Sequence, residues 1–192
     1  MSASARLPGR PRDARVDLAI LAAAEAQLRE RGYAGMSMES VAAAARTSVP
    51  SVRRRYQDKE ELVSAVIASL RIEPLAAGGS RPRDDALAIL TNFQRNLKRP
   101  RVMAVLGSLM AEEDRHPVLM ELFRSRLVLP RRTMLQAALA KGVESRDLPA
   151  TIDIDAASNT MIGAFYARYI ADHQIPNDWA GRVLAVVWPS SY

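Results

Sequence analysis

Three consecutive arginines, Arg53, Arg54 and Arg55, are the strongest chemical signal in this sequence. They stand in the segment "TSVPSVRRRYQDKEEL", just after a proline that favours the start of a helix. Guanidinium groups bind phosphate and carboxylate oxygens through paired hydrogen bonds. In a helix, Val52 and Tyr56 share the inward stripe, and Arg54 points almost opposite to them. The pattern therefore predicts a short helix whose outer face meets an anion.

Positive charge is concentrated at the N-terminal end of the chain. Residues 1–59 hold eleven Lys or Arg and six Asp or Glu, which places +5 of the formal net charge of +6 there. A basic end joined to a nearly neutral, apolar body indicates a polyanion-binding module carried on a second part. The alternative is an arginine-rich surface that meets only water and counterions.

The residues around the arginines predict three helices separated by tight turns. The first covers 15–31, and Gly32 follows it as a left-handed C-terminal cap. The second begins after Ser37, a good N-cap, and the third begins after Ser48, with Pro50 early enough in the helix to do no harm. Two short helices joined by a tight turn, the second one outwardly basic, form a helix-turn-helix. In that motif the second helix lies in the major groove of DNA.

Two stretches carry a family resemblance, "ILAAAEAQLRERGY" and "MSMESVAAAARTSVPSVRRRYQDKEELVSAVI". They contain an opening helix that ends in Gly-aromatic, a capped helix with "VA", a short recognition helix that ends in an aromatic, and a fourth helix that starts at "DKEEL". From Val16 to about Ile67 the chain thus resembles the TetR-type transcriptional regulators. The resemblance implies an all-α chain of about nine helices, in which a three-helix DNA-binding domain with the helix-turn-helix precedes a helical bundle for ligand binding and dimerisation.

Two positions depart from the family pattern, which usually has Gly in the turn and Tyr near the middle of the recognition helix. Here these positions hold Arg46 and Arg53. Arg46 must either adopt a left-handed conformation at some cost or alter the turn. Arg53 replaces a hydroxyl that commonly meets a phosphate with a cation that can bind it more strongly.

The resemblance also implies which side chains approach DNA. Arg54 is expected to read a guanine through its O6 and N7 atoms, and a second phosphate contact stays open as its alternative role. The other expected contacts, from the recognition helix and from helix N-termini, are Ser37, Ser48, Ser51, Arg53 and Lys59.

The N-terminal segment "LPGRPR" resembles the AT-hook minor-groove peptide. Arg10 and Arg12 in a flexible basic arm are therefore expected to enter a narrow A·T groove, with a disordered charged tail as the alternative. We accordingly divide the chain into the arm at 1–12, a helix-turn-helix domain at 13–67, and an effector-binding and dimerisation domain at 68–192.

The remainder of the chain predicts a helical body, because its apolar residues recur at helical spacing and no segment alternates as a strand. Pro130 is expected to break or kink a long helical stretch. The segment "HPVLMELFRSRLVLPRRTMLQAAL" looks like the ligand-binding half of one TetR subgroup, in which the last two helices pair with those of a second chain. Unless these helices pack only within one chain, the expected dimer contacts are Gly163, Tyr166, Ala167, Trp179 and Val183.

A small apolar effector is a possible partner of the body. Methionine side chains adapt to irregular ligands, and an aromatic ring adds apolar surface. A methionine stripe is, however, more often ordinary core. The residues expected to line such a pocket are Phe93, Met103, Leu106, Met110 and Met134.

Other classes of protein find little support in the sequence. There is no cysteine, no nucleophile motif and no phosphate-binding glycine loop, so an enzyme is not expected. His116 follows an acidic run, but its position before Pro117 indicates a solvated helix end, and no metal or cofactor is expected. No apolar run approaches bilayer length, and the basic segment lacks the exposed aromatics of membrane-surface or RNA-binding modules.

Together these features predict a cytoplasmic homodimer that binds a palindromic operator in double-stranded DNA. We expect a repressor that a small molecule releases, without a membrane partner. The alternative is a helical protein that binds nucleic acid without sequence preference or lies on a membrane surface.

Overall fold

The computed structural model describes residues 14–70 and 81–189, and every regular element in these ranges is helical. The elements are α1 (Ala14–Gly35), α2 (Met38–Ala44), α3 (Val49–Arg53), α4 (Lys59–Ser69), α5 (Pro82–Leu97), α6 (Val102–Ala111), α7 (Pro117–Phe123), the π-helical turn η1 (Arg124–Val128), α8 (Leu129–Glu144), α9 (Ile154–Ile170) and α10 (Trp179–Val187). Since α7, η1 and α8 follow one another without a gap, these ranges contain nine helical rods, and the all-α prediction of about nine helices is confirmed. None of the described helices is long and apolar enough to cross a membrane.

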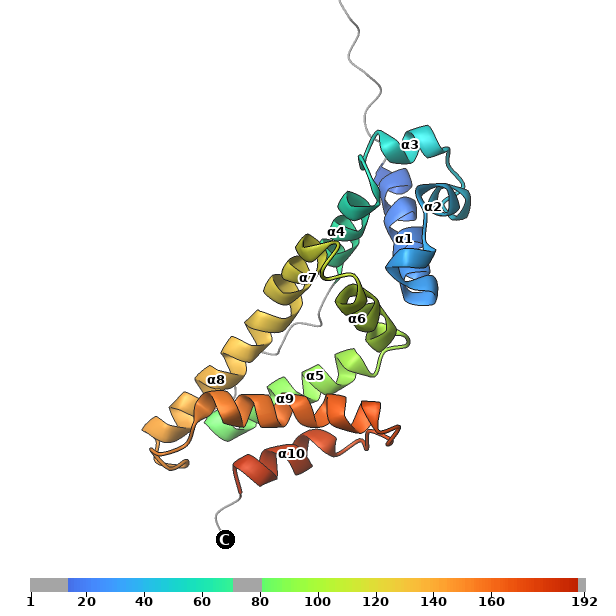
Figure 1. Ribbon diagram of the computed structural model, residues 1–192. Coiled ribbons are helices and arrows are strands. Elements are labelled where there is room, and N and C mark those ends of the chain that lie inside the picture. Colours follow the sequence, from blue (N-terminus) through green and yellow to red (C-terminus); the bar gives the residue numbers. More distant parts are fainter. Residues whose placement is uncertain (1–13, 71–80, 190–192) are drawn as a thin grey trace, which may run out of the picture.

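The helices α1 to α4 form one end of the molecule, with α3 at its tip (Figure 1). The predicted stripe of α1 is confirmed, because Ile20, Ala24 and Leu28 are buried. Val41 of α2 and Val52 of α3 are also fully buried and pack in the same cluster. Each short helix therefore contributes one apolar side to a small core and leaves the opposite side to solvent.

Gly32 ends the regular part of α1. Its φ of 69° is left-handed, as the sequence predicts, and the helix assignment continues to Gly35 only across this kink. A Cβ at position 32 would lie 2.8 Å from the Ser108 hydroxyl oxygen of α6, and that oxygen accepts a hydrogen bond of 2.6 Å from the Tyr33 N–H. Glycine is thus required here both by the backbone conformation and by the close approach of α6.

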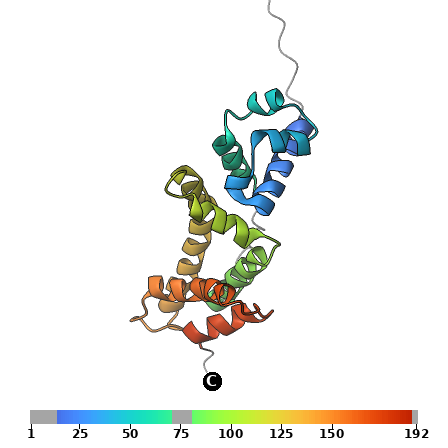
Figure 2. The same ribbon diagram turned by 45° about the vertical axis from the view of Figure 1, so that its right-hand side comes forward.

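The body occupies the other end of the molecule, where α9 and α10 lie farthest from α3 (Figures 1 and 2). Its core is formed by α5, α8, α9 and α10 and contains an aromatic group of Phe93, Phe165 and Trp179. The ring centroids of Phe165 and Trp179 are 5.4 Å apart in an edge-to-face arrangement, which aromatic side chains favour. The two ends of the molecule therefore have separate apolar centres.

Pro130 lies just after the π-helical turn. The sequence predicts a break or kink there, but the chain passes from α7 through η1 into α8 without interruption. A proline ring would clash with the carbonyl four residues earlier in a regular α-helix. The wider π-helical turn is the kind of local adjustment that relieves such a clash.

The core of the helix-turn-helix end extends into the body. Besides residues of α1 to α4, its apolar cluster includes Leu109 of α6, Leu119 of α7 and Leu127 of η1. Packing therefore continues across the boundary predicted after residue 67. A movement of α6 or α7 would be transmitted directly to the helices that carry α3.

Candidate nucleic-acid interface

The turn between α2 and α3 depends on a strained arginine. Arg46 adopts a φ of 53°, so the first of the two alternatives for this position is the observed one. Its N–H donates to the Ala43 carbonyl at 3.2 Å, and the Thr47 N–H donates to the Ala42 carbonyl at 3.0 Å. The side chain of Arg46 is exposed. The sequence pattern addresses only the backbone of Arg46, but the charge of this exposed side chain next to α3 makes it a further candidate for DNA contact.

Caps and apolar contacts fix the start and the orientation of α3. The Ser48 hydroxyl accepts a hydrogen bond of 3.3 Å from the Ser51 N–H, and Pro50 occupies the first turn, as predicted. Val52 is fully buried, and Tyr56 packs partly buried against the same cluster. The inward stripe predicted from spacing is therefore confirmed, and it fixes which side of α3 faces outward.

Arg53 and Arg54 lie on the exposed side of α3. The Arg54 side chain has no hydrogen bond or ion pair with any described residue. Arg53 makes one weak contact, with its Nη2 atom 3.5 Å from the carboxylate of Glu39. The pKa of Glu39 is lowered, chiefly by a hydrogen bond from its own backbone N–H, with smaller contributions from Ser37 and Arg53. Both arginines therefore remain available to an external anion.

Arg55, the third arginine of the run, faces inward. Its side chain is only 10% exposed and forms an ion pair with Asp17 of α1. Its Nη1 atom also donates to the Ser51 carbonyl and hydroxyl oxygens, both at 3.0 Å. Arg55 thus meets an internal carboxylate and holds α3 against α1. The Ser51 hydroxyl accepts from Arg55 and can still donate its proton outward.

Two further predicted DNA contacts already have partners within the protein. The Ser37 hydroxyl accepts from the Ser40 N–H at 3.1 Å and so caps α2. The Lys59 ammonium donates to the Tyr33 carbonyl at 3.0 Å and lies 4.2 Å from the centre of the Tyr33 ring. Their phosphate contacts stay predictions. Arg10 and Arg12 lie outside the described residues.

His116 joins the two ends of the molecule. Its Nδ1 atom is 2.7 Å from a carboxylate oxygen of Glu60 in α4 and 3.5 Å from the Tyr33 hydroxyl. Burial, with the nearby Glu60 carboxylate, raises the pKa of Tyr33 to about 12, so its hydroxyl is neutral and can donate. In the described ranges no three His, Asp or Glu side chains are grouped to hold a metal ion.

The residues predicted to line an effector pocket do not come together. Phe93 belongs to the body core, Leu106 belongs to the core of the helix-turn-helix end, and Met103 touches both clusters. Met110 is 57% exposed, and Met134 is also exposed. A cavity exists between the two ends of the molecule, but none of these five residues lines it. The predicted lining is corrected accordingly.

The predicted dimer contacts also divide into two groups. Trp179 is 2% exposed and packs against Phe93 and Phe165, so it fills the core of its own chain instead of an interface. Tyr166 packs on the same two phenylalanine rings. The other three predicted contacts are on the surface or half-buried, and a Cβ added at Gly163 would meet nothing within 4 Å. They are Gly163, Ala167 and Val183.

Exposed apolar side chains on α9 and α10 complement this set. Ile170 is 82% exposed and Val186 is 77% exposed, and half of Tyr169 is exposed as well. The sequence pattern predicts apolar bulk from Tyr169 but does not identify Ile170 or Val186. Periodicity alone does not distinguish the apolar side of a helix that packs on its own chain from the side that packs on another chain.

Two sequence families match this chain. Residues 20–66 match the family described as "Bacterial regulatory proteins, tetR family", and residues 78–187 match the one described as "Tetracyclin repressor-like, C-terminal domain". The second match alone covers more than half of the chain. The chain belongs to the TetR family.

Individual relatives agree with this assignment. The TetR-family chain is 27% identical over 172 residues to "Uncharacterized HTH-type transcriptional regulator YdeS" of Bacillus subtilis (strain 168). The aligned region covers 88% of this chain and 86% of YdeS. Its fold matches HlyIIR, a hemolysin II transcriptional regulator, with a TM-score of 0.65 at 18% identity over 92% of this chain and 99% of HlyIIR. MexZ, described as a key repressor responsible for antibiotic resistance in Pseudomonas aeruginosa, matches with a TM-score of 0.66 at 23% identity over 91% of this chain and 92% of MexZ.

Proposed function

We propose that this TetR-family regulator is a repressor that binds a palindromic DNA operator as a homodimer and is released by a small molecule. The family assignment supports DNA binding, and the names of HlyIIR and MexZ are those of a transcriptional regulator and a repressor. The other class considered, a helical protein that binds nucleic acid without sequence preference or lies on a membrane, lacks such support.

The single observation that carries the proposal is the exposed cationic face at the tip of the molecule. This face consists of Arg46, Arg53 and Arg54. Side chains on one surface of a short helix fit the major groove, which an α-helix can enter. Arg55 and its ion pair with Asp17 hold that helix in a fixed orientation. We therefore assign phosphate contacts to Arg46 and Arg53 and base contact to Arg54.

A dimer would place two such helices on one side of the duplex. Palindromic sites require recognition helices about 34 Å apart, one turn of DNA. The exposed apolar side chains of α9 and α10, among them Ile170 and Val186, support a dimer face at this end of the molecule. A contact at the end opposite α3 leaves both recognition helices free.

Release requires that the effector favour a conformation whose α3 helices no longer match successive grooves. A tenfold loss of operator affinity requires a preference of about 1.4 kcal/mol for that conformation. The shared packing of α6 and α7 with α1 and α4 supplies a physical connection from the body to α3.

The experiment that tests this function is a selection of random duplex DNA on the purified protein, followed by titration of the recovered sequence at two salt concentrations. We expect a palindrome with half-sites about ten base pairs apart and a steep dependence on salt. Recovery of no common sequence, with weak binding to every duplex, would contradict sequence-specific regulation. Arg126→Gln, which removes an exposed arginine of η1, should bind the recovered sequence as the wild type does.

A further inference from the structure

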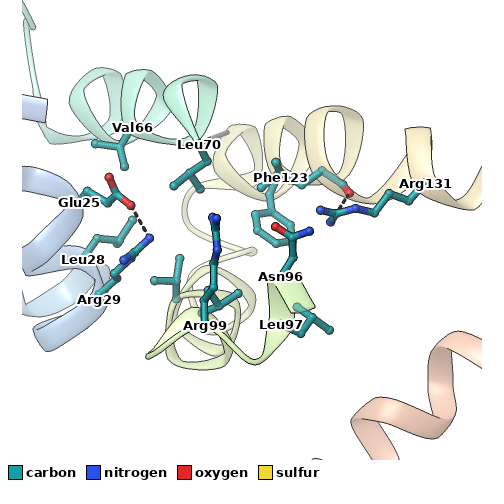
Figure 3. A pocket seen from close by; sticks show the side chains of 13 residues that line it. Glu25, Leu28, Arg29, Val66, Leu70, Asn96, Leu97, Arg99, Phe123 and Arg131 are labelled. Atoms are coloured by element: carbon teal, nitrogen blue, oxygen red, sulfur yellow. Dashed lines mark hydrogen bonds and ion pairs between the residues drawn. The ribbon is translucent and has the colours of Figure 1, made fainter. Parts of the chain in front are cut away.

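A cavity of about 80 Å³ lies where the helix-turn-helix end meets the body. Leu28 of α1 and Val66 of α4 line it from one end of the molecule, and Leu97, Val105 and Phe123 line it from the other. Its walls are thus mainly apolar. Figure 3 shows that the labelled side chains approach it from several helices that are distant in sequence.

Charge in this cavity is unbalanced. Among the described residues that line it, three are arginines, Arg29, Arg99 and Arg131, and one is acidic, Glu25. Glu25 forms an ion pair with Arg29, its neighbour one turn along α1 (Figure 3). The lining carboxylate is therefore already engaged, and the cavity has a net positive character.

Arg131 is the unusual member of this group. Its Nε and Nη2 atoms are buried and have no hydrogen-bond partner, and its remaining nitrogen makes only a 3.4 Å contact with the Leu127 carbonyl. Burial lowers the pKa of Arg131, the nearby Tyr166 hydroxyl raises it and the charge of Arg99 lowers it, but a guanidinium remains a cation in proteins. Buried cations without an acceptor are costly, so such a group indicates an anionic partner.

We propose that this cavity binds a small monocarboxylic acid with an apolar body, whose carboxylate is held by Arg131. Nε and Nη2 of a guanidinium point in parallel and match the two oxygens of a carboxylate. The apolar body would lie against Leu97, Val105 and Phe123. A carboxylate on an apolar body suits the site better than inorganic phosphate, because the mainly apolar walls cover the apolar body, and phosphate has no such part.

Size limits the ligand further. One water molecule needs about 10–15 Å³ on the same scale, so the cavity holds roughly six water-sized groups. That corresponds to a short aliphatic or single-ring acid. Hexanoate and benzoate are suitable probes, and hexanamide and benzamide are their neutral counterparts.

The position of the site gives the ligand a regulatory role, and this part of the inference rests on the proposed function. The cavity is lined by α1 and α4, which carry the helix-turn-helix, and by α5, α6, α7, η1 and α8 of the body. A carboxylate bound to Arg131 of α8 lies between the body and α1, so its binding changes the distance between the body and the helix-turn-helix end. The same acid is therefore the molecule that releases DNA.

The test is isothermal titration calorimetry of the purified chain, without DNA, against the two acids, the two amides and inorganic phosphate. We expect each acid to bind at least tenfold more tightly than its amide, and phosphate to bind more weakly than the acids. Arg131→Gln should remove the preference for acid over amide while the amides still bind, and Arg126→Gln should change nothing. Equal affinity for acid and amide, or an unchanged preference in Arg131→Gln, would overturn the site.

Two additions keep the test decisive. Arg131→Lys retains the charge and should keep part of the preference, and thermal unfolding of each variant separates a lost ligand from a lost fold. A separate titration of operator DNA, with and without benzoate, tests regulation. Binding of the acid without any change in DNA affinity would refute the regulatory role and leave the site intact. Absence of DNA binding in the titration without ligand would instead refute the proposed function.

Discussion

Arginines at the two ends of this molecule have opposite surroundings. Arg53 and Arg54 on α3 are exposed, so water solvates their charge and their lack of a strong protein partner costs little. Arg131 in the body has two buried nitrogens without an acceptor, so its charge is unfavourable until an anion arrives. We therefore propose that the same kind of side chain binds an extended polyanion at one end and a discrete small anion at the other.

The different surroundings of these arginines predict that the two sites respond differently to salt concentration. Contacts from exposed cations to DNA release counterions, so they weaken steeply as salt rises. A buried ion pair is screened much less. DNA binding should therefore be far more salt-dependent than binding of the carboxylic acid.

The largest expected effect is that of Arg54→Ala on operator binding. A bidentate contact to guanine contributes about 1–3 kcal/mol of discrimination, so affinity for the operator should fall roughly 5- to 150-fold for each half-site that loses the contact. Binding to a duplex altered at the contacted guanine should change little. Fluorescence anisotropy with both duplexes measures this difference, and an equal loss on both would make Arg54 a phosphate ligand instead.

Arg55→Met should mainly lower the stability of the fold. Loss of the contacts with Asp17 and Ser51 should reduce the free energy of unfolding by about 1–2 kcal/mol, since a half-buried carboxylate loses its partner. Urea unfolding measures this change, with Arg54→Met as the control expected to stay within about 0.5 kcal/mol of the wild type. Identical stabilities of the two variants would remove the distinction between the inward and the outward arginine.

Arg131→Met should instead increase the stability of the fold. Replacing a buried, unpaired cation with an apolar side chain of similar length should raise the free energy of unfolding by about 1 kcal/mol. The matched change Arg126→Met, at an exposed position of η1, should have almost no effect. The same urea experiment measures both variants, and destabilisation by Arg131→Met would show that its guanidinium already has a favourable partner.

Glu39→Gln should have the smallest effect. The Glu39 carboxylate contacts Arg53 and repels phosphate, so removing its charge should tighten DNA binding roughly twofold on every sequence. Affinity measured at low and moderate salt checks this, because the gain should shrink as salt rises. A weaker complex would mean that Glu39 orients Arg53 for its phosphate.

The local structure of the DNA-binding end could be predicted because neighbouring residues determine it. The caps at Ser37, Ser48 and Asp58 each bind an N–H three positions away. The left-handed conformation of Arg46 is one of the two alternatives that the sequence leaves open for the turn. The role of Arg55 could not be predicted in this way. Its partner Asp17 lies 38 positions earlier, and spacing within α3 says only that Arg55 flanks the buried stripe.

Predictions for the body failed where burial depends on tertiary packing. Met103, Leu106 and Met110 share one side of α6, but Met110 lies near the end of that helix, where no neighbour covers it. Trp179 has the bulk expected of an interface residue and fills its own core instead. A periodic pattern shows which side of a helix is apolar, but it does not show which element covers that side.

Salt dependence of operator binding tests most directly the claim that α3 and its turn form the DNA-binding surface. The measurement compares the wild type with a variant in which Arg46, Arg53 and Arg54 are all replaced by Gln. These changes remove two assigned phosphate contacts from each of two subunits, so the slope of log affinity against log salt should become shallower by about 3–4. Arg126→Gln should keep the wild-type slope. An unchanged slope in the triple variant would show that DNA binds elsewhere on the molecule.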